Sequence, residues 1–213
     1  MSESSTPAST NHGRLITTAY QDWQPQHDNA GTQVYTALCN AGHQTNAFTK
    51  YLIWRQCIDF LTSFLGAFAT LNNAKLRLYI TSKPDRISSS AHRSCIVICK
   101  GNQSLPPITA DYQGVLTGAE CGIKHIDIGA DLDGIILNAY NDFIITDYNT
   151  LIEKTGITKV MITSYPDRYD VNPNDESDTR RGIEFQTPAQ ANKPLLIINY
   201  TLPAIGNNGM ILG

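Results

Sequence analysis

The clearest pattern of hydrophobic and polar positions lies in residues 141–163, NDFIITDYNTLIEKTGITKVMIT. Residues 142–146 and 157–163 are short and rich in β-branched side chains, which is typical of strands. Between them, Thr150 and Glu153 have the spacing of a capping box, in which each side chain bonds the other residue's backbone N–H. The stretch therefore predicts a strand, one short helical turn and a second strand. We expect the remaining strands to be organised around this pair.

Alternation of apolar and polar residues recurs along the chain. In residues 74–81 (AKLRLYIT), Leu76, Leu78 and Ile80 share one face, as in a strand with one wet side. Further strands are predicted at residues 14–20, 32–38, 48–60, 95–100, 124–128, 183–186 and 195–200. About ten strands and one helical turn predict an all-β fold. Specifically, we expect a two-sheet antiparallel β-sandwich with jelly-roll topology.

The chain shows no fixed-period repeat and no internal domain boundary. Residues 1–13 are polar and predict a disordered N-terminal arm, residues 14–202 predict the sandwich domain, and residues 203–213 a C-terminal tail. The tail ends in apolar residues that a single chain has little reason to expose. We expect both termini to be held by neighbouring subunits. The candidate assembly contacts are Trp23, Ile205, Met210, Ile211 and Leu212.

Composition narrows the class of protein. Charged residues make up 16% of the 213 residues, against about 25% in an average soluble domain. The net charge of −3 argues against a nucleic-acid coat or a binder of anionic membranes, which need a basic face. No apolar run approaches the roughly 18 residues of a membrane span. The N-terminus lacks the pattern of a secretory signal, so we expect synthesis in a cytoplasm.

The five cysteines are an odd number, so at least one thiol is free. Cys95 and Cys99 share one face of a predicted strand, roughly 13 Å apart, which is too far for a disulfide. Their spacing also does not match a zinc knuckle. We predict buried thiols that pack as small hydrophobic groups.

Three stretches, at residues 55–81, 140–167 and 193–201, resemble jelly-roll β-sandwich domains of phage structural proteins. Related modules are known as disaggregatase-like or DNRLRE domains. The likeness lies in an arginine strand with a Phe-x-Thr-Ser turn, an A-x-L-x-L strand and a terminal K-P-x-L strand. Leu61 stands where the family usually has Asp, so any polar contact of that Asp is absent. The resemblance implies a β-sandwich in a virion or external setting, and it implies no catalytic residues.

Acidic residues in the loop at 164–181 are candidate calcium ligands, because Ca²⁺ takes six to eight oxygen ligands. They are Asp167, Asp170, Asp175, Glu176 and Asp178. Their spacing matches no defined calcium loop, and neighbouring arginines (Arg168, Arg180, Arg181) offer neutralisation instead. A solvated or salt-bridged loop is the favoured interpretation. Asp127, Asp131 and Asp133 form a second, weaker cluster that we interpret as a turn.

No motif for hydrolysis or nucleotide binding is present, whether GxSxG, HExxH, a P-loop or GxGxxG. Histidines at positions 12, 27, 43, 92 and 125 are scattered in polar contexts and predict exposed loop residues. We therefore expect no enzyme, no catalytic residue and no cofactor, with Ca²⁺ as the one candidate ion. Trp54 is a predicted core residue. The rings of Trp23, Tyr112, Tyr165 and Tyr169 fall in predicted loops, where they could stack on sugars or contact protein.

These observations favour a virion structural protein, made in the host cytoplasm. It would be a capsid decoration protein or a tail- or fibre-associated module. Its partners would be other copies of itself and a major capsid or tail protein, with no nucleic acid and no membrane. A carbohydrate-binding module that attaches to surface glycans is the alternative. A polysaccharide-degrading enzyme is disfavoured because no acid/base pair stands out.

Overall fold

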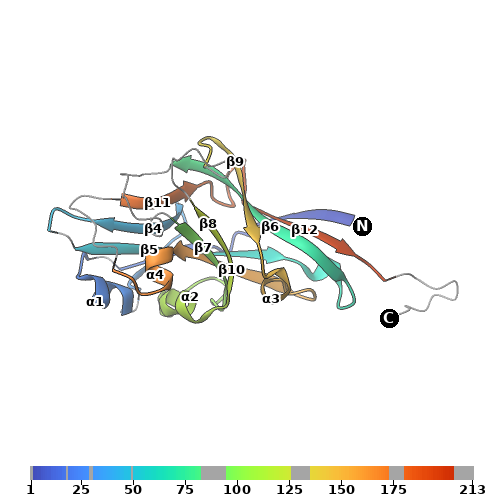
Figure 1. The fold of residues 1–213 in the computed structure, drawn as a ribbon, viewed down its shortest axis with the longest axis horizontal. Helices are drawn as coiled ribbons and strands as arrows, with labels where there is room; N and C mark the ends of the chain where they lie inside the picture. Colours follow the sequence, from blue (N-terminus) through green and yellow to red (C-terminus); the bar gives the residue numbers. More distant parts are fainter. Residues whose placement is uncertain are drawn as a thin grey trace.

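The computed structural model describes residues 2–17, 19–28, 31–48, 50–82, 95–125, 135–172 and 180–203 (Figure 1). Strands dominate these residues. The first six are β1 Ser2–Pro7, β2 Gly13–Ile16, β3 Gln33–Tyr35, β4 Cys39–Thr45, β5 Tyr51–Leu61 and β6 Thr70–Ser82. The others are β7 Cys95–Lys100, β8 Glu120–His125, β9 Ala139–Ile145, β10 Ile157–Ser164, β11 Arg180–Phe185 and β12 Leu195–Thr201. The prediction of an all-β fold is confirmed.

Several short helices connect the strands. They are α1 Trp23–Asp28, α2 Gly114–Thr117, α3 Tyr148–Leu151, α4 Tyr165–Arg168 and the 3-10 helices η1 Ser63–Leu65 and η2 Thr109–Gln113. The prediction of a single helical turn is therefore wrong. These helices have three to six residues, too few to show the 3.6-residue periodicity on which a sequence-based prediction depends.

All strand pairs are antiparallel, and the main path runs β1-β12-β6-β11-β4-β5-β10-β7-β8. Strand β2 pairs with β3 and β5, and β9 pairs with β6. On β6, Leu76 lies between Leu196 of β12 and Phe143 of β9, whereas Ile80 lies between Phe185 of β11 and β9. Strands β12 and β11 therefore follow one another along one edge of β6, and β9 occupies the other edge.

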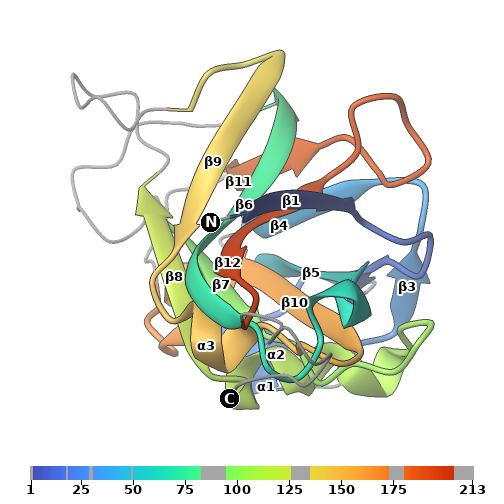
Figure 2. The ribbon, with the colours of Figure 1, turned by 90° about the vertical axis from the view of Figure 1, so that its right-hand side faces the viewer.

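The sheet curls until its far end meets β9. The backbone N–H groups of Thr146 and Asp147, just after β9, donate to the carbonyl oxygen of Cys121 on β8 at 2.8 and 3.2 Å. Figure 2, viewed along the molecule, shows the strands arranged around a common interior with β1 and β12 in front. The observed architecture is thus a curled antiparallel sheet around one enclosed core.

The core contains the apolar faces that the alternation predicted. Leu76, Leu78 and Ile80 of β6 are fully buried, while the residues between them are partly exposed. Strand β5 differs, because ten of its eleven residues are buried or partly buried. Its Ile58 and Phe60 face the main core, its other face is covered by α1 and η2, and β2 pairs with it along one edge. A strand covered on both faces needs no polar side, so its sequence alternates poorly.

The segment from β9 to β10 follows its prediction except at the helix start. The Asp147 side chain, at the N-cap of α3, accepts a hydrogen bond from the Thr150 N–H at 3.2 Å. The Glu153 carboxylate instead accepts from the N–H and hydroxyl of Thr155. The capping box of Thr150 and Glu153 is therefore wrong. An aspartate placed three residues before Thr150 is an equally good cap.

Two elements were missed because their sequences are polar. Trp23 falls in a predicted loop, yet it begins helix α1, Trp23–Asp28. Strand β4, with the sequence CNAGHQT, is buried along almost its whole length. Its Cys39 and Ala41 face the main core, and its His43 lies on the other face against the ring of Trp23. The hydrophobicity of a short segment does not show whether distant parts of the chain will bury it.

The N-terminal residues do not form a disordered arm. Residues 2–7 pair with β12, from Ser2 opposite Tyr200 to Pro7 opposite Leu195. The Thr6 hydroxyl also donates to the Leu61 carbonyl at 3.1 Å. Strand pairing satisfies the backbone N–H and C=O groups of this segment, and it does not depend on the polarity of the side chains. The polar composition of residues 1–13 therefore gave the wrong prediction of a disordered arm. The strand also needs no neighbouring subunit. Residues 204–213 of the expected C-terminal tail lie outside the described residues.

Asp142 on β9 gives the fold a pH dependence. Arg77 on β6 donates to its two oxygens at 2.6 and 2.9 Å, and Lys75 Nζ lies 2.7 Å away. Hydrogen bonds from Arg77, and then Lys75, outweigh partial burial and lower the pKa of Asp142 to about 2 from 3.8. Because the folded-state pKa is depressed, the pair stabilises the fold above about pH 4 and loses this effect as the pH falls towards 2. Since the side chains are partly exposed, the contribution is below about 1 kcal/mol.

We expect NMR titration of the Asp142 carboxyl carbon to show this depressed pKa, and Arg77→Met to move it back towards its ordinary value. A titration unchanged by Arg77→Met would contradict the assignment.

Candidate functional site

One buried ion pair stands out at the end of the molecule that carries α1 and α4. Arg55 of β5 and Asp167 of α4 are both fully buried. Arg55 Nε donates to Asp167 Oδ2 at 2.8 Å, and Nη2 donates to Oδ1 at 2.6 Å. The hydroxyl of Thr163 also donates to Oδ2. Two-point pairing of this kind is the strong geometry for arginine and carboxylate.

Two further N–H groups of Arg55 donate to backbone carbonyls. Its Nη1 donates to the carbonyl of Tyr112 at 2.7 Å and its Nη2 to that of His27 at 3.0 Å. The guanidinium carbon lies 3.9 Å from the centre of the Tyr112 ring. Burial lowers the pKa of Arg55, but the charge and hydrogen bonds of Asp167 outweigh burial and raise it. The group stays charged and ties β5, α1, η2 and α4 together.

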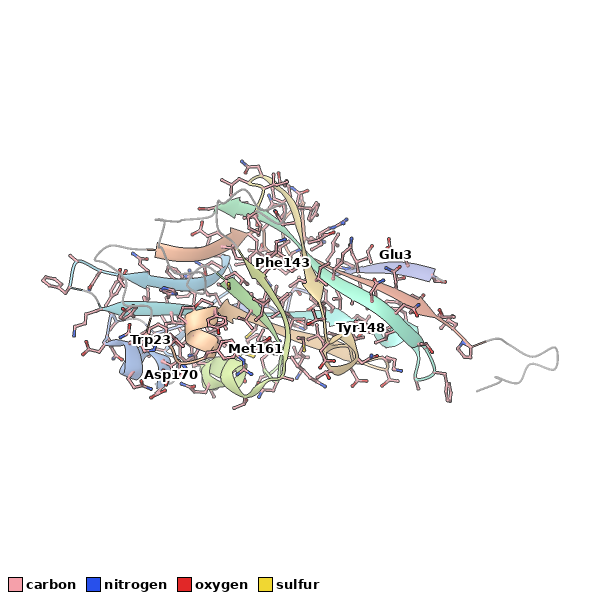
Figure 3. The ribbon with its side chains drawn as sticks, in the orientation of Figure 1. Glu3, Trp23, Phe143, Tyr148, Met161 and Asp170 are labelled. Carbon is pink, nitrogen blue, oxygen red and sulfur yellow. The ribbon has the colours of Figure 1, made fainter. Side chains whose placement is uncertain are left out.

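Trp23 lies beside this ion pair and is buried, with 4% of its surface exposed. Its indole N–H donates to Asp170 Oδ1 at 3.2 Å, and Figure 3 shows the two side chains at the same end of the molecule. The ring stacks on His27 and meets Tyr51 and His43 edge-on. The assignment of Trp23 as an assembly contact in a loop is therefore wrong. A ring enclosed by its own chain has no surface left for a neighbour.

Three histidines predicted to be exposed are buried instead: His12, His27 and His43. The ring of His27 lies 2.6 Å from Asp28 Oδ1 through Nδ1 and 3.0 Å from the Asp167 carbonyl through Nε2. His92 lies outside the described residues, and the side chain of His125 is not described. A polar local sequence does not reveal which elements will later pack over it.

The arrangement nearest to a catalytic pair is His43 Nδ1 and Ser164 Oγ, 3.3 Å apart. A serine nucleophile needs a base at such a distance, but it also needs access to a substrate. His43 is fully buried and Ser164 is 2% exposed, so no substrate carbonyl can approach. The pair is a structural hydrogen bond in this conformation.

Both described acidic residues of the predicted calcium loop have protein partners. Asp167 is held by Arg55, and Asp170 accepts from Trp23 and Gln24. Among the residues that the structure describes, no group of three or more His, Cys, Asp or Glu side chains could hold a metal ion. The other candidate ligands (Asp127, Asp131, Asp133, Asp175, Glu176, Asp178) lie outside the described residues.

A pocket of about 90 Å³ lies where the start of β4 and the ends of β6 and β11 meet. Its lining includes Leu38, Cys39, Thr81, Glu184 and Phe185. Sites for small molecules usually enclose about 300–1,000 Å³, so this hollow is too small for a typical organic substrate. In the described part of the chain, no helix has the length and apolarity needed to cross a bilayer.

A different kind of site lies at the opposite end, where exposed apolar side chains gather. We call it the apolar end surface. It comprises Leu61 (59% exposed), Phe64 (45%), Phe68 (66%), Ile157 (38%) and Leu202 (54%), together with the partly exposed Tyr200. Figure 2 looks onto this end of the molecule. Single exposed apolar residues are normal, whereas a contiguous group marks an interaction surface.

Contacts across the ladders show that these residues are neighbours. Leu61 pairs with Ile157 between β5 and β10, and the rings of Phe64 and Tyr200 lie 6.2 Å apart. Thr201 pairs with Thr70, which places Leu202 at the level of the loop that carries Phe68. The uncharged run LTSFLGAFATLN at residues 61–72 was the signal in the sequence, but nothing in it says that four strand ends converge there.

Aromatic rings proposed to bind sugars separate into two groups. Trp23 and Tyr112 are buried, so they offer no stacking face. Tyr165 and Tyr169 lie with ring centres 4.4 Å apart, and Tyr169 is 43% exposed. Trp54 is buried, as predicted.

All five cysteines are free and buried, in agreement with the prediction of packed thiols. Burial raises the pKa of Cys39 and Cys99 to about 12 and that of Cys121 to about 11, and it raises that of Cys57 well above its usual value. Because the thiolate is the reactive form, we expect a thiol reagent to modify none of them in the folded protein. All five should react in denaturant, counted by mass spectrometry. Modification of any thiol before unfolding would contradict this.

No protein-family model matches the chain, and a search of curated proteins also finds no match. The resemblance to phage jelly-roll domains stays a prediction.

Proposed function

We propose that the protein is a non-enzymatic structural subunit of a virion that acts through assembly contacts. The observation that carries this proposal is the apolar end surface, which exposes six neighbouring apolar side chains at one end of the molecule. Interfaces between subunits are built around such apolar groups. The partners would be other copies of the chain and a major capsid or tail protein.

The polar interior supports a structural role over catalysis. Arg55, Asp167, His43 and Ser164 are buried and bonded to one another or to the backbone. An active site needs such groups to converge on a space that a substrate can enter. Here they join helices to strands, so their effect is to make the subunit rigid.

The finer architecture belongs to the same proposal. We infer a jelly-roll arrangement because three stretches of the chain, in the same order along the sequence, resemble jelly-roll domains. The curled antiparallel sheet with an enclosed core is compatible with it. A single module without the repeats of a fibre shaft favours decoration of a capsid over a place in the tail.

The proposal is tested by incorporation of the tagged chain into particles of the virus that encodes it, purified by density gradient. We expect the Phe64→Ser/Phe68→Ser variant to be lost from the particle fraction, because it makes the apolar end surface polar. The matched control is Ile144→Ser, which changes a residue 60% exposed on β9. Equal incorporation of all three proteins would refute the assembly contact. Absence of the unmodified chain from every particle fraction would refute the virion role.

Carbohydrate binding remains the second proposal because Tyr165 and Tyr169 form an accessible pair of rings. Stacking of a sugar on Tyr169 predicts that Tyr169→Ala abolishes binding on a glycan array. Tyr35→Ala, at a tyrosine 39% exposed on β3, is the control. An array with no bound glycan for the unmodified chain would exclude this alternative.

A further inference from the structure

Asp59 of β5 carries a buried carboxyl group that is only half satisfied. The residue is 2% exposed. Its Oδ2 accepts a hydrogen bond from the Ser9 hydroxyl at 2.7 Å. Its Oδ1 is also buried and has no hydrogen-bond partner among the residues that the structure describes. Burying an ionised group without full hydrogen bonding is unfavourable, so this environment favours the neutral, protonated form of the side chain.

Residues 8–12, which follow β1, cover this carboxyl group, and we call them the covering segment. The backbone N–H of Ala8 donates to the Pro194 carbonyl, and that of Ser9 donates to the Asp59 carbonyl, both at 2.9 Å. Ser9 therefore holds Asp59 through its backbone as well as through its hydroxyl. Because the segment continues directly from β1, the contacts of Ser9 also fasten β1 to the end of β5.

The surroundings of Asp59 contain more acceptors than donors. Gln103 is fully buried, and its Nε2 donates to the carbonyl of Ile58, the residue before Asp59, at 3.3 Å. Its Oε1 is a second buried acceptor that lacks a partner in the described part of the chain. Lys159, opposite Asp59 on β10, donates from Nζ to the backbone carbonyl of Gln103 at 2.7 Å. A proton on Asp59 adds a donor in a region where two acceptors are unsatisfied.

The charged and titratable groups around Asp59 set the sign of its pH dependence. Burial raises the pKa of the Asp59 carboxyl above its usual value, and it outweighs the hydrogen bond from Ser9 and the electrostatic effects of His12 and Lys159, which lower the pKa. Cys57, two residues earlier on the same face of β5, stays a neutral thiol because burial raises its pKa well above the usual value.

Lifting the covering segment gives the Asp59 carboxyl access to water and returns its pKa towards the ordinary value. The covered state therefore binds the proton more tightly than the lifted state does. By linkage, acid favours the covered state, and this effect is lost as the pH rises through the raised pKa.

We propose that Asp59 is a proton-operated switch for the N-terminal strand. Its protonated form holds the covering segment and β1 on the sheet, and its ionisation raises the fraction of molecules in which they are detached. The switch takes one proton from water and returns it to water. Detachment leaves the edge of β12 without its partner strand, and a free edge of this kind can pair with a strand of another chain. The proposal goes beyond a structural role in a virion and does not depend on it.

NMR titration of the side-chain carboxyl carbons in the unmodified, isolated chain is the first test. We expect the Asp59 carboxyl to titrate above the ordinary range of aspartate. An Asp59 pKa within or below that range would overturn the proposal. This measurement needs no variant, so it holds even if substitutions at Asp59 prevent folding.

Hydrogen exchange measures the attachment of the covering segment. The protection factors of the Ala8 and Ser9 N–H groups should increase as the pH falls from 7 to 4, by at most about tenfold per pH unit because one proton is involved. The Thr146 N–H, which donates to the Cys121 carbonyl near β8, is the reference for opening of the whole fold. Protection of Ala8 and Ser9 that stays constant, or that changes in parallel with Thr146, would contradict a local switch.

Asp59→Asn imitates the protonated side chain. In this variant, the Ala8 and Ser9 N–H groups should keep the high protection seen at low pH across the whole range, with folding checked by circular dichroism. Asp22→Asn, at an exposed aspartate paired with Lys50, is the matched control and should follow the unmodified chain. His12 is present in all three proteins, so its own titration cancels in the comparison. The same pH profile for Asp59→Asn and the unmodified chain would overturn the proposal. No particle is used, so the outcome is separate from that of the incorporation experiment.

Discussion

Replacing Asp167 with asparagine should lower the free energy of unfolding by about 3–5 kcal/mol, because it leaves the charge of Arg55 buried without its partner. Arg55 cannot release its proton to avoid this cost. Its other contacts are the carbonyls of Tyr112 and His27 and the face of the Tyr112 ring, which do not supply a countercharge. Urea unfolding followed by circular dichroism measures the change.

Two further variants make this expectation specific to the buried pair. Arg55→Met/Asp167→Leu removes both charges and should recover most of the lost stability, because apolar replacements of a buried ion pair are often neutral or stabilising. Asp22→Asn breaks the exposed pair of Lys50 and Asp22, whose charged atoms lie 2.5 Å apart, and should cost less than about 1 kcal/mol. If Asp167→Asn and Asp22→Asn lowered the free energy of unfolding equally, the buried pair would matter no more for stability than the exposed pair.

Phe143→Ala is expected to destabilise the fold by about 3–5 kcal/mol through the cavity it leaves in the core. Phe143 is fully buried inside the curled sheet, and Figure 3 shows it at the centre of the molecule. It lies between β6 and the place where β9 meets β8, so the effect reports on the closure of the curl. The midpoint and slope of urea unfolding give the change in free energy.

Its neighbour provides the matched control. Ile144 on the same strand is 60% exposed, so Ile144→Ala should change stability by no more than about 0.5 kcal/mol. A large loss for Ile144→Ala together with a small loss for Phe143→Ala would reverse the assignment of inner and outer faces of β9. Such a result would contradict the enclosed core.

Strands with one solvent-exposed face could be predicted from the sequence, and β6 is the clearest case. Its alternation of Leu76, Leu78 and Ile80 with polar residues reflects the two-residue period of any strand at a water boundary. The apolar strands β7, β10 and β12 were found for a related reason, because β-branched runs need little context. The burial of the cysteines and of Trp54 could be predicted for the same reason, because these residues lie in or beside apolar stretches of the sequence.

Elements whose burial depends on distant segments escaped prediction. Strand β4 and helix α1 are polar in sequence, and each is covered by partners far along the chain. Strand β1 was expected to be an arm because side-chain composition does not count the backbone hydrogen bonds that it makes with β12. The same limit explains the misplacement of Trp23, which is buried only because α1 packs on β5 and the residues after α4.

By itself, the sequence determined that the chain forms strands, that its charge is low and that its thiols are packed inside, because these properties depend on side chains within a few residues of one another. Only the tertiary structure decided that Arg55 meets Asp167, 112 residues away, and that Leu61, Phe64, Phe68 and Leu202 share one surface. Contacts of that kind arise from strand pairing between remote segments, and their partners are not encoded in any local pattern.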